Sequence, residues 1–254
     1  MSQPECLSLP VKKIIEHGQD QFFSLYLEKF AAPCRTGQFV MIRPESWNSE
    51  PLWARPFSIC ENADSGLRIF FQIAGRGTRL LSTSGIGERI KIWGPLGNGF
   101  DISGEENLLI LAGGMGIAPF TGLIKNHADP ERVSLVFGHT AELDCFPIHE
   151  LPKTARVTTF KQETEKDLKT FQDLIQARVK SSSGQKILAC GPLPFLRFVH
   201  RTCRENAQQA WVSLENRMAC GVGACLGCVQ EDKNGEYVTT CKHGPVFSVN
   251  DIRI

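Results

Sequence analysis

The stretch LLILAGGMGIAP, residues 108–119, joins a run of five apolar residues to a loop that contains three glycines. A continuous apolar run of this length is typical of a strand covered on both faces, as in a parallel sheet. Glycines at the end of such a strand admit a phosphate group to the N-terminus of the following helix. Pro119 replaces the last glycine of the usual dinucleotide-binding pattern, so the stretch predicts a variant nucleotide-binding loop.

Strands of the same style recur downstream and alternate with helical segments. RVSLVFG (132–138), ARVTTF (155–160) and KILACG (186–191) have the strand pattern, and residues 167–180 and 194–207 have helical patterns. Alternating strands and helices predict a doubly wound α/β sheet. We therefore expect a Rossmann-like domain over residues 103–212.

The tetrapeptide ACGP, residues 189–192, ends a strand of this sheet. Ligands of open α/β sheets gather at the carboxyl ends of the strands. Gly191 would let a flat ring approach the backbone there. Cys190 is equally compatible with a buried core thiol.

Upstream of residue 103 the pattern is different. FSLYLE (23–28), QFVMIR (38–43) and LRIFFQI (67–73) alternate apolar and polar residues with period two, and turn-forming residues separate them. Short strands at this spacing predict a small antiparallel barrel over residues 1–102. The fold class is therefore an all-β barrel plus an α/β domain.

Two motifs of the barrel region have the chemistry to hold a pyrophosphate. RPFSI (55–59) places an arginine on a strand, and GRGTRL (75–80) follows a strand and opens a short helix. An arginine and free backbone amides can together neutralise a pyrophosphate. Each motif taken alone is also compatible with an exposed arginine or an ordinary helix cap.

Cysteine and glycine dominate the third region, residues 213–254. RMACGVGACLGC (217–228) contains the pattern C-x4-C-x2-C, and Cys241 follows after twelve further residues. This is the spacing of plant-type [2Fe–2S] centres. Gly221, Gly223 and Gly227 are expected to permit positive φ and close approach of backbone amides to sulfur. The interpretation is a small cluster-binding subdomain with Cys220, Cys225, Cys228 and Cys241 as ligands.

A structural zinc site is the alternative, because zinc also takes four thiolates. Paired C-x2-C motifs are usual for zinc, whereas Cys241 stands alone. The other six cysteines occur singly and are expected to be free thiols.

Composition and charge exclude several other functions. The 254 residues carry 28 Lys plus Arg against 27 Asp plus Glu, and no basic stripe suited to a nucleic acid is present. No apolar stretch is long enough to span a bilayer, and the first residues lack the apolar core of a signal peptide. The sequence therefore predicts a soluble, cytoplasmic protein.

The order of these motifs resembles the ferredoxin reductase superfamily. R-P-x-S, G-x-G-T, G-G-x-G-x-A-P and C-G-P follow one another in a barrel and a Rossmann-like domain. The tail, SLENRMACGVGACLGCV and CKHGPVF, is similar to the electron transfer subunits of dihydroorotate dehydrogenase, which carry FAD and [2Fe–2S]. The resemblance covers essentially the whole chain.

The resemblance implies a set of binding residues and no catalytic residue. FAD would contact Arg55, Pro56, Phe57, Ser58, Gln72, Ile73, Gly77 and Thr78. NAD would contact Gly114, Gly116, Cys190 and Gly191. FGHTAELD lacks an arginine that many relatives use for a 2′-phosphate, which favours NAD over NADP. His139 and His149 are expected to be locally bonded or surface groups.

The implied activity is an electron relay in pyrimidine biosynthesis. A catalytic partner subunit with FMN oxidises dihydroorotate, single electrons cross the [2Fe–2S] centre to FAD, and FAD passes a hydride to NAD⁺. A heterotetramer of catalytic and electron transfer subunits is expected. The alternative keeps the cofactors and changes the partner to a hydrogenase, a sulfite reductase or a ferredoxin:NAD(P) transhydrogenase. A zinc-stapled adaptor without enzyme activity is the third hypothesis.

Overall fold

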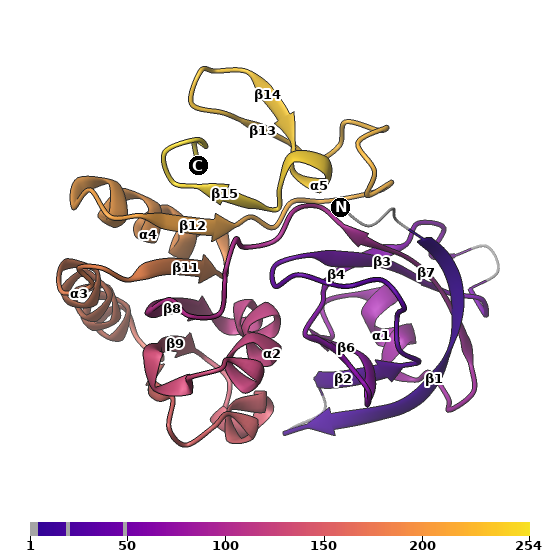
Figure 1. Ribbon diagram of the computed structural model, residues 1–254. Helices are drawn as coiled ribbons and strands as arrows, with labels where there is room; N and C mark the ends of the chain where they lie inside the picture. The colour runs from indigo at the N-terminus through magenta and orange to yellow at the C-terminus, as the bar shows by residue number, and fades with distance from the viewer. Residues whose placement is uncertain (1–4, 19–20, 48–49) are drawn as a thin grey trace.

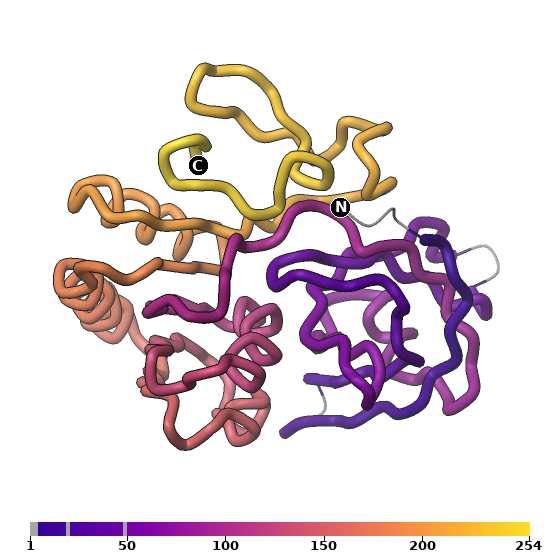
Figure 2. Tube along the Cα trace, in the orientation of Figure 1, coloured from indigo at the N-terminus to yellow at the C-terminus, as the bar shows by residue number. Residues whose placement is uncertain are grey.

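The computed structural model describes residues 5–18, 21–47 and 50–254, so Pro4, one of the first residues that lack the apolar core of a signal peptide, lies outside the described residues. A barrel formed by the first hundred residues lies beside a layered α/β domain (Figure 1). The C-terminal tail, yellow in Figure 2, runs over the α/β sheet and reaches the barrel. The predicted combination of an antiparallel barrel with a Rossmann-like domain is confirmed.

The barrel is a seven-stranded antiparallel sheet in the described part of the chain, in the order β4-β3-β7-β1-β2-β6-β5. Its strands alternate inward and outward side chains, and the inward ones enclose one apolar core that includes Leu25, Val40 and Ile69. The strands are β1 (Glu5–His17), β2 (Phe22–Leu27), β3 (Phe39–Pro44), β4 (Arg55–Ser58), β5 (Glu61–Ala63), β6 (Gly66–Gln72) and β7 (Arg89–Leu96).

Strand β1 is the longest element of the barrel and turns its corner. Its first half, Glu5 to Pro10, pairs with β7, and its second half, from Val11, pairs with β2. Pro10 has no N–H to donate, and the register shifts between Val11 and Lys13. The proline and the shift interrupt the period-two pattern, which explains why this strand is hard to recognise in the sequence.

The α/β sheet has the order β10-β9-β8-β11-β12-β15. Every residue of β8 is buried, as the apolar run predicts. All neighbouring strands are parallel except β12 and β15. The strands are β8 (Leu108–Gly113), β9 (Val133–His139), β10 (Arg156–Lys161), β11 (Lys186–Cys190), β12 (Ala210–Ser213) and β15 (Val246–Ser248).

Helices cover both faces of this sheet. Phe120 and Ile124 of α2 (Ala118–Asn126) pack on one face together with barrel residues. Helices α3 (Glu165–Lys180) and α4 (Leu193–Glu205) pack on the other face. Short 3₁₀ helices complete the connections: η1 (Gly114–Ile117), η2 (Pro130–Arg132), η3 (Leu143–Cys145) and η4 (Pro147–Glu150).

The remaining elements belong to the tail, except α1 (Arg76–Ser82), which closes the barrel after β6. The tail contains β13 (Val229–Glu231), β14 (Tyr237–Thr239), α5 (Thr240–His243) and β15. Because β15 pairs antiparallel with β12, the tail completes the edge of the α/β sheet. The boundary proposed at residues 212 and 213 therefore falls within β12, at its last residue.

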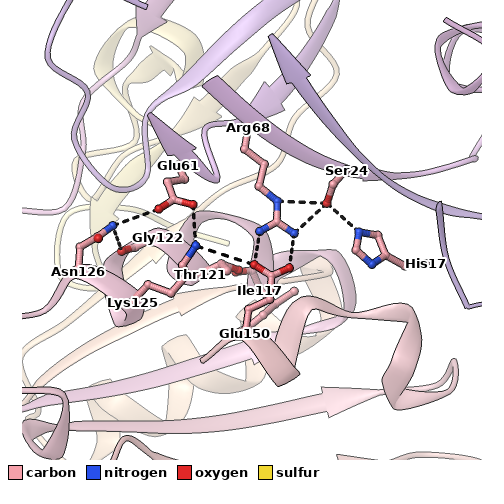
Figure 3. Close-up of polar contacts among 10 residues, drawn as sticks. All are labelled: His17, Ser24, Glu61, Arg68, Ile117, Thr121, Gly122, Lys125, Asn126 and Glu150. Carbon is pink, nitrogen blue, oxygen red and sulfur yellow. Dashed lines mark hydrogen bonds and ion pairs between the residues drawn. The ribbon is translucent and has the colours of Figure 1, made fainter. Parts of the chain in front are cut away.

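A polar network joins the barrel to the α/β domain (Figure 3). Arg68 of β6 binds Glu150 of η4, and it also binds Ser24, whose hydroxyl contacts His17.

In the ranges that the structure describes, no helix is both long and apolar enough to cross a membrane.

Candidate functional site

A cavity of about 700 Å³ lies where the barrel, the α/β sheet and the tail meet. Apolar and aromatic residues form much of its wall, as is usual for cofactor sites. Three regions of the fold supply the wall: the barrel, the turns that follow β8 and β11, and the tail, through residues 213–218 and Pro245. The lining residues from the barrel are Phe39, Arg55, Pro56, Phe57, Ser58, Phe70, Phe71, Gln72, Ala74 and Thr78.

Arg55 is held in place by main-chain carbonyls rather than by an acidic side chain. Its Nη1 donates to the carbonyl oxygens of Trp53 (2.9 Å) and Ala54 (3.3 Å). Within the described residues it forms no ion pair, so its charge is available to an anion. A Cβ at Gly77 would lie 3.0 Å from Arg55 Nε, which explains the glycine in GRGT.

Two further polar side chains on the cavity wall have no hydrogen-bond partner among the described residues. They are the hydroxyl of Ser58 and the amide of Gln72, at the ends of β4 and β6. Phe57 and Phe71 lie beside them with ring centroids 5.7 Å apart. Free donors and acceptors next to aromatic rings are suited to a flat heterocycle with polar edges.

Thr78 differs from its predicted role in one respect. Its Oγ1 accepts hydrogen bonds from the backbone amides of Ala74 (2.8 Å) and Gly75 (3.1 Å). The side chain therefore shapes the first turn of α1 itself, while still lining the cavity.

The ends of β8 and β11 meet at the point where the strand order of the sheet reverses. Cys190 pairs with Ala112, and a Cβ at Gly116 would lie 2.0 Å from the carbonyl oxygen of Cys190. Only glycine fits such a contact between the two predicted motifs. Met115, Gly116, Cys190 and Gly191 line the cavity, which is the expected ligand position for an open α/β sheet.

The thiol of Cys190 is uncharged at neutral pH. Burial raises its pKa to about 12, and the nearby negative charge of Glu215 contributes to this rise. Hydrogen bonds with Ser213 and Gly191 act in the opposite direction and lower the pKa. Neutral sulfur beside Gly191 leaves this end of the cavity weakly polar.

Three of the predicted binding residues lie away from the cavity wall. Ile73 packs against the barrel core, and Gly77 lies against the Arg55 side chain. Gly114 lies in η1 with φ +51°. The helix after β8 begins at Ala118, after the 3₁₀ turn, with Pro119 in its first turn where no amide partner is needed.

The tail contributes a wall that the sequence motifs did not reveal. Glu215, Asn216, Arg217 and Met218 line the cavity and continue directly into the cysteine loop. Glu215 and Arg217 form no ion pair in the described structure. No periodicity marks this segment; the sequence pointed to it only as part of the tail SLENRMACGVGACLGCV that carries the family resemblance, and not as a cavity wall.

The four predicted ligand cysteines come together in two pairs. The amide of Cys225 donates to Cys220 Sγ (3.4 Å), and the amide of Cys241 donates to Cys228 Sγ (3.4 Å). Further amides of the loop donate to sulfur, from Val222 to Cys220 and from Gly223 to Cys241. Amide-to-sulfur hydrogen bonds are characteristic of iron–sulfur ligation.

Gly221 (φ +72°) and Gly223 (φ +83°) adopt the positive φ that was expected of the loop. Gly227 does not, and Leu226 instead has φ +55°. A non-glycine residue with positive φ is costly, and such strain gathers at functional sites. The expectation of a positive φ at Gly227 is therefore wrong, because the turn occurs one residue earlier, but the Gly227 backbone does approach sulfur, since a Cβ there would lie 3.5 Å from Cys225 Sγ.

The pKa of Cys220 is about 6, because amide hydrogen bonds outweigh the opposing effect of burial. Burial and the neighbouring Cys228 raise the pKa of Cys241 to about 12. Thiolate is the form that binds metal, so Cys220 is ready to bind and Cys241 must lose a proton.

The arrangement fits a two-iron cluster better than a single zinc ion. The thiols are grouped two by two, Cys220 with Cys225 and Cys228 with Cys241, as the two irons of a [2Fe–2S] cluster require, whereas one zinc ion takes all four thiolates.

Comparison with known proteins points to the same chemistry. Residues 215–253 match the family model described as the iron–sulfur cluster binding domain of dihydroorotate dehydrogenase B. The electron transfer subunit of dihydroorotate dehydrogenase B (NAD(+)) from Clostridium acetobutylicum is 34% identical over 216 residues, 84% of each chain. Its counterpart from Fusobacterium nucleatum is 29% identical, over 96% of this chain and 97% of that one.

Solved structures share the fold at lower identity. An NADH-dependent reduced ferredoxin-NADP oxidoreductase superposes with a TM-score of 0.80 at 23% identity, over 96% of this chain and 89% of that one. A ferredoxin NADP⁺ reductase from Neisseria gonorrhoeae gives 0.61 at 15% identity, over 84% and 94%. With the paired cysteines, the cavity shared by the barrel, the α/β sheet and the tail, and relatives that cover most of the chain in agreement, the chain belongs to the family of electron transfer subunits of dihydroorotate dehydrogenase B (NAD(+)).

Proposed function

We propose that this chain binds FAD in the cavity and a [2Fe–2S] cluster on Cys220, Cys225, Cys228 and Cys241, and exchanges electrons with NAD and a catalytic partner. One observation carries the proposal. A single cavity wall contains the barrel motifs, the ends of β8 and β11, and the segment that enters the cysteine loop. Flavin, nicotinamide and cluster would therefore lie in contact with one another or within a short distance for electron transfer.

Arg55 would neutralise the pyrophosphate of FAD, since no carboxylate competes for its guanidinium in the described structure. Ser58 and Gln72 would orient the flavin edge with their free polar groups. When bound, FAD interconverts hydride and single-electron chemistry, and the cluster carries one electron at a time. The aromatic and apolar wall would keep water away from the ring.

Gly116 and Gly191 would admit NAD to the flavin, and the neutral Cys190 thiol would lie beside the nicotinamide. The loop after β9, GHTAELD, has no arginine or lysine to pair with a 2′-phosphate, which favours NAD over NADP. Histidine is present there, but His139 is buried and bonded to the carbonyl of Ala141.

The catalytic partner would be the FMN subunit of dihydroorotate dehydrogenase, in a heterotetramer with this chain. Support comes from the relatives named above and from the exposed edge of the cysteine loop. Val222 and Leu226 are exposed there beside the exposed ligand Cys225, and exposed apolar residues that lie together mark interaction sites.

The six cysteines outside the cluster site are unbridged, as expected in a reducing compartment, which supports a cytoplasmic location.

The first experiment is an anaerobic ultraviolet–visible spectrum of the purified chain, with iron, zinc and acid-extracted flavin quantified on the same sample. We expect flavin bands on a broad iron–sulfur absorption, two irons per chain, and bleaching by NADH. Stoichiometric zinc with a featureless spectrum would overturn the proposal.

Two variants assign the metal site. Cys228→Ala should lose the iron and its absorption while the flavin remains, because a ligand thiolate is missing. Cys203→Ala is the control, since its buried thiol, with a pKa of about 12, lies in the α4 core.

A second experiment tests the partner. The chain is mixed with the dihydroorotate dehydrogenase from the same organism, and NAD⁺-linked formation of orotate is measured. No orotate formation would contradict the proposed partner.

A further inference from the structure

Asn216 connects the cavity wall to both segments that bear the buried cysteines. Its Nδ2 donates to the carbonyl oxygen of Cys228 (3.3 Å) and to Oγ1 of Thr240 (2.7 Å). Thr240 precedes Cys241 and is fully buried, and its own amide donates to the same Cys228 carbonyl (2.9 Å). One side chain therefore ties residues 228 and 240 to the cavity wall.

The two cysteine pairs have different surroundings. Cys228 and Cys241 are buried in an apolar cluster with Phe39, Met41 and Leu96 of the barrel, and Met218 packs against this cluster. Cys225 is exposed to solvent and Cys220 is half-buried. We call Cys228 and Cys241 the inner pair, and Cys220 and Cys225 the outer pair.

The inner pair is the one that adjoins the flavin cavity. Phe39 and Met218, which contact the inner-pair cluster, also line the cavity. Trp93 of β7 holds the outer side of the loop, because its Nε1 donates to the carbonyl oxygen of Cys220 (3.2 Å). The barrel and Asn216 thus both hold the loop.

We propose that Asn216 is a positioning residue that holds the inner cysteine pair against the flavin cavity and sets the potential of the cluster. The inference rests on the proposed function, since it needs both cofactors. Donation to the Cys228 carbonyl places the positive end of the Asn216 amide dipole beside this ligand residue, and positive charge near an iron–sulfur centre favours its reduced, more negative state and so raises its potential. Because Phe39 and Met218 belong to both the inner-pair cluster and the cavity wall, the inner pair is the side of the cluster that faces the flavin.

The test uses the holoprotein and a neutral variant of similar size, Asn216→Leu. In Asn216→Leu protein that is loaded with both cofactors, we expect an altered EPR spectrum of the reduced cluster and a lower midpoint potential. A roughly tenfold change in the equilibrium of electron exchange between flavin and cluster corresponds to about 59 mV for a one-electron couple.

Asn98→Leu is the matched control. Asn98 also holds the tail by its side chain, donating to the carbonyl oxygens of His243 and Val246 and accepting from the Val246 amide, but among the described residues none of these hydrogen bonds involves a cysteine. We expect Asn98→Leu to lower the free energy of unfolding while leaving the EPR spectrum and the potential unchanged. Equal shifts in the two variants would overturn a specific role for Asn216.

A second variant keeps the inference testable if Asn216→Leu does not fold. Thr240→Val removes only the hydroxyl that accepts from Asn216, and should shift the potential in the same direction by a smaller factor. No shift in a folded, loaded Thr240→Val or Asn216→Leu would overturn the inference alone. A wild-type chain that binds no cluster would overturn the proposed function as well.

Discussion

Arg68 and Glu150 form a bidentate ion pair that joins the barrel to the α/β domain (Figure 3). Nη1 lies 2.5 Å from Oε2 and Nη2 lies 2.8 Å from Oε1. The Arg68 side chain is 1% exposed, and its remaining donors reach the Ser24 hydroxyl. Lys125 of α2 lies 3.9 Å from the same carboxylate and binds Glu61 of β5. The network fixes the angle between the two domains that form the cavity.

Replacing Arg68 with Met should lower the free energy of unfolding by about 3 kcal/mol, because Glu150 is left partly buried without its main partner. Urea denaturation measures the loss. The double variant Arg68→Met/Glu150→Met should recover most of it, since a well-packed apolar pair can replace a buried ion pair. As the control, Lys169→Met removes the exposed ion pair with Asp173 and should lower the free energy of unfolding by about 0.5 kcal/mol or less. An equal loss of stability in Arg68→Met and Lys169→Met would contradict the conclusion that the Arg68–Glu150 ion pair stabilises the fold.

Stability should fall as the pH decreases from 7.5 to 5.5. Burial, and then the positive charge of Arg68, lower the pKa of His17 below 6.5. Burial also lowers the pKa of His200, despite hydrogen bonds to the carbonyls of Ile252 and Val249. Below pH 6.5 the unfolded chain takes up these protons before the folded chain does, so protons favour unfolding.

Denaturation at several pH values measures this dependence. His17→Gln and His200→Gln should each reduce the slope of stability against pH in this range. Glu150 adds a separate loss only at lower pH, because its pKa is lowered from 4.5 in the folded chain. Burial opposes this shift, but the hydrogen bond and charge of Arg68, together with the charge of Lys125, outweigh it. Slopes that match wild type in both histidine variants would refute the explanation.

Gly116→Ala should impair NAD binding more than FAD binding. The added Cβ would meet the Cys190 carbonyl oxygen at 2.0 Å and force β8 and β11 apart, at a cost of about 2 kcal/mol. Flavin content should stay near that of wild type, while anaerobic reduction by NADH should slow at least about tenfold, as 1.4 kcal/mol of lost binding requires. Gly85→Ala is the control, because no atom lies within 4 Å of its Cβ position. Normal reduction of Gly116→Ala by NADH would contradict the NAD site.

Arg55→Met should weaken FAD binding by roughly tenfold to a hundredfold, since a charge-assisted hydrogen bond contributes about 1.5–3 kcal/mol. Equilibrium dialysis of FAD against the flavin-free chain measures the change. Arg76→Met is the control on the neighbouring helix, because Arg76 already pairs with Glu50 in the described structure. Iron content should remain at the wild-type level in both variants, and unchanged FAD affinity in Arg55→Met would remove Arg55 from the site.

The pattern of the sequence was sufficient for the two domains and for the cysteine site. The alternation of FSLYLE and LRIFFQI, the apolar run of β8 and the cysteine spacing each depend on neighbours within a few residues. Local periodicity sets which faces are buried, and cysteine spacing sets which thiols one loop can gather. For these features, a sequence alone is enough.

Only the tertiary structure decided how these parts face one another. The cavity wall at residues 213–218, the pairing of β15 with β12 and the Arg68–Glu150 ion pair all join residues distant in sequence or unmarked by any pattern. An arginine in a strand is expected to be exposed, yet Arg68 is buried because Glu150, 82 residues away, supplies its partner. Such contacts depend on the packing of finished domains, and no short-range pattern encodes them.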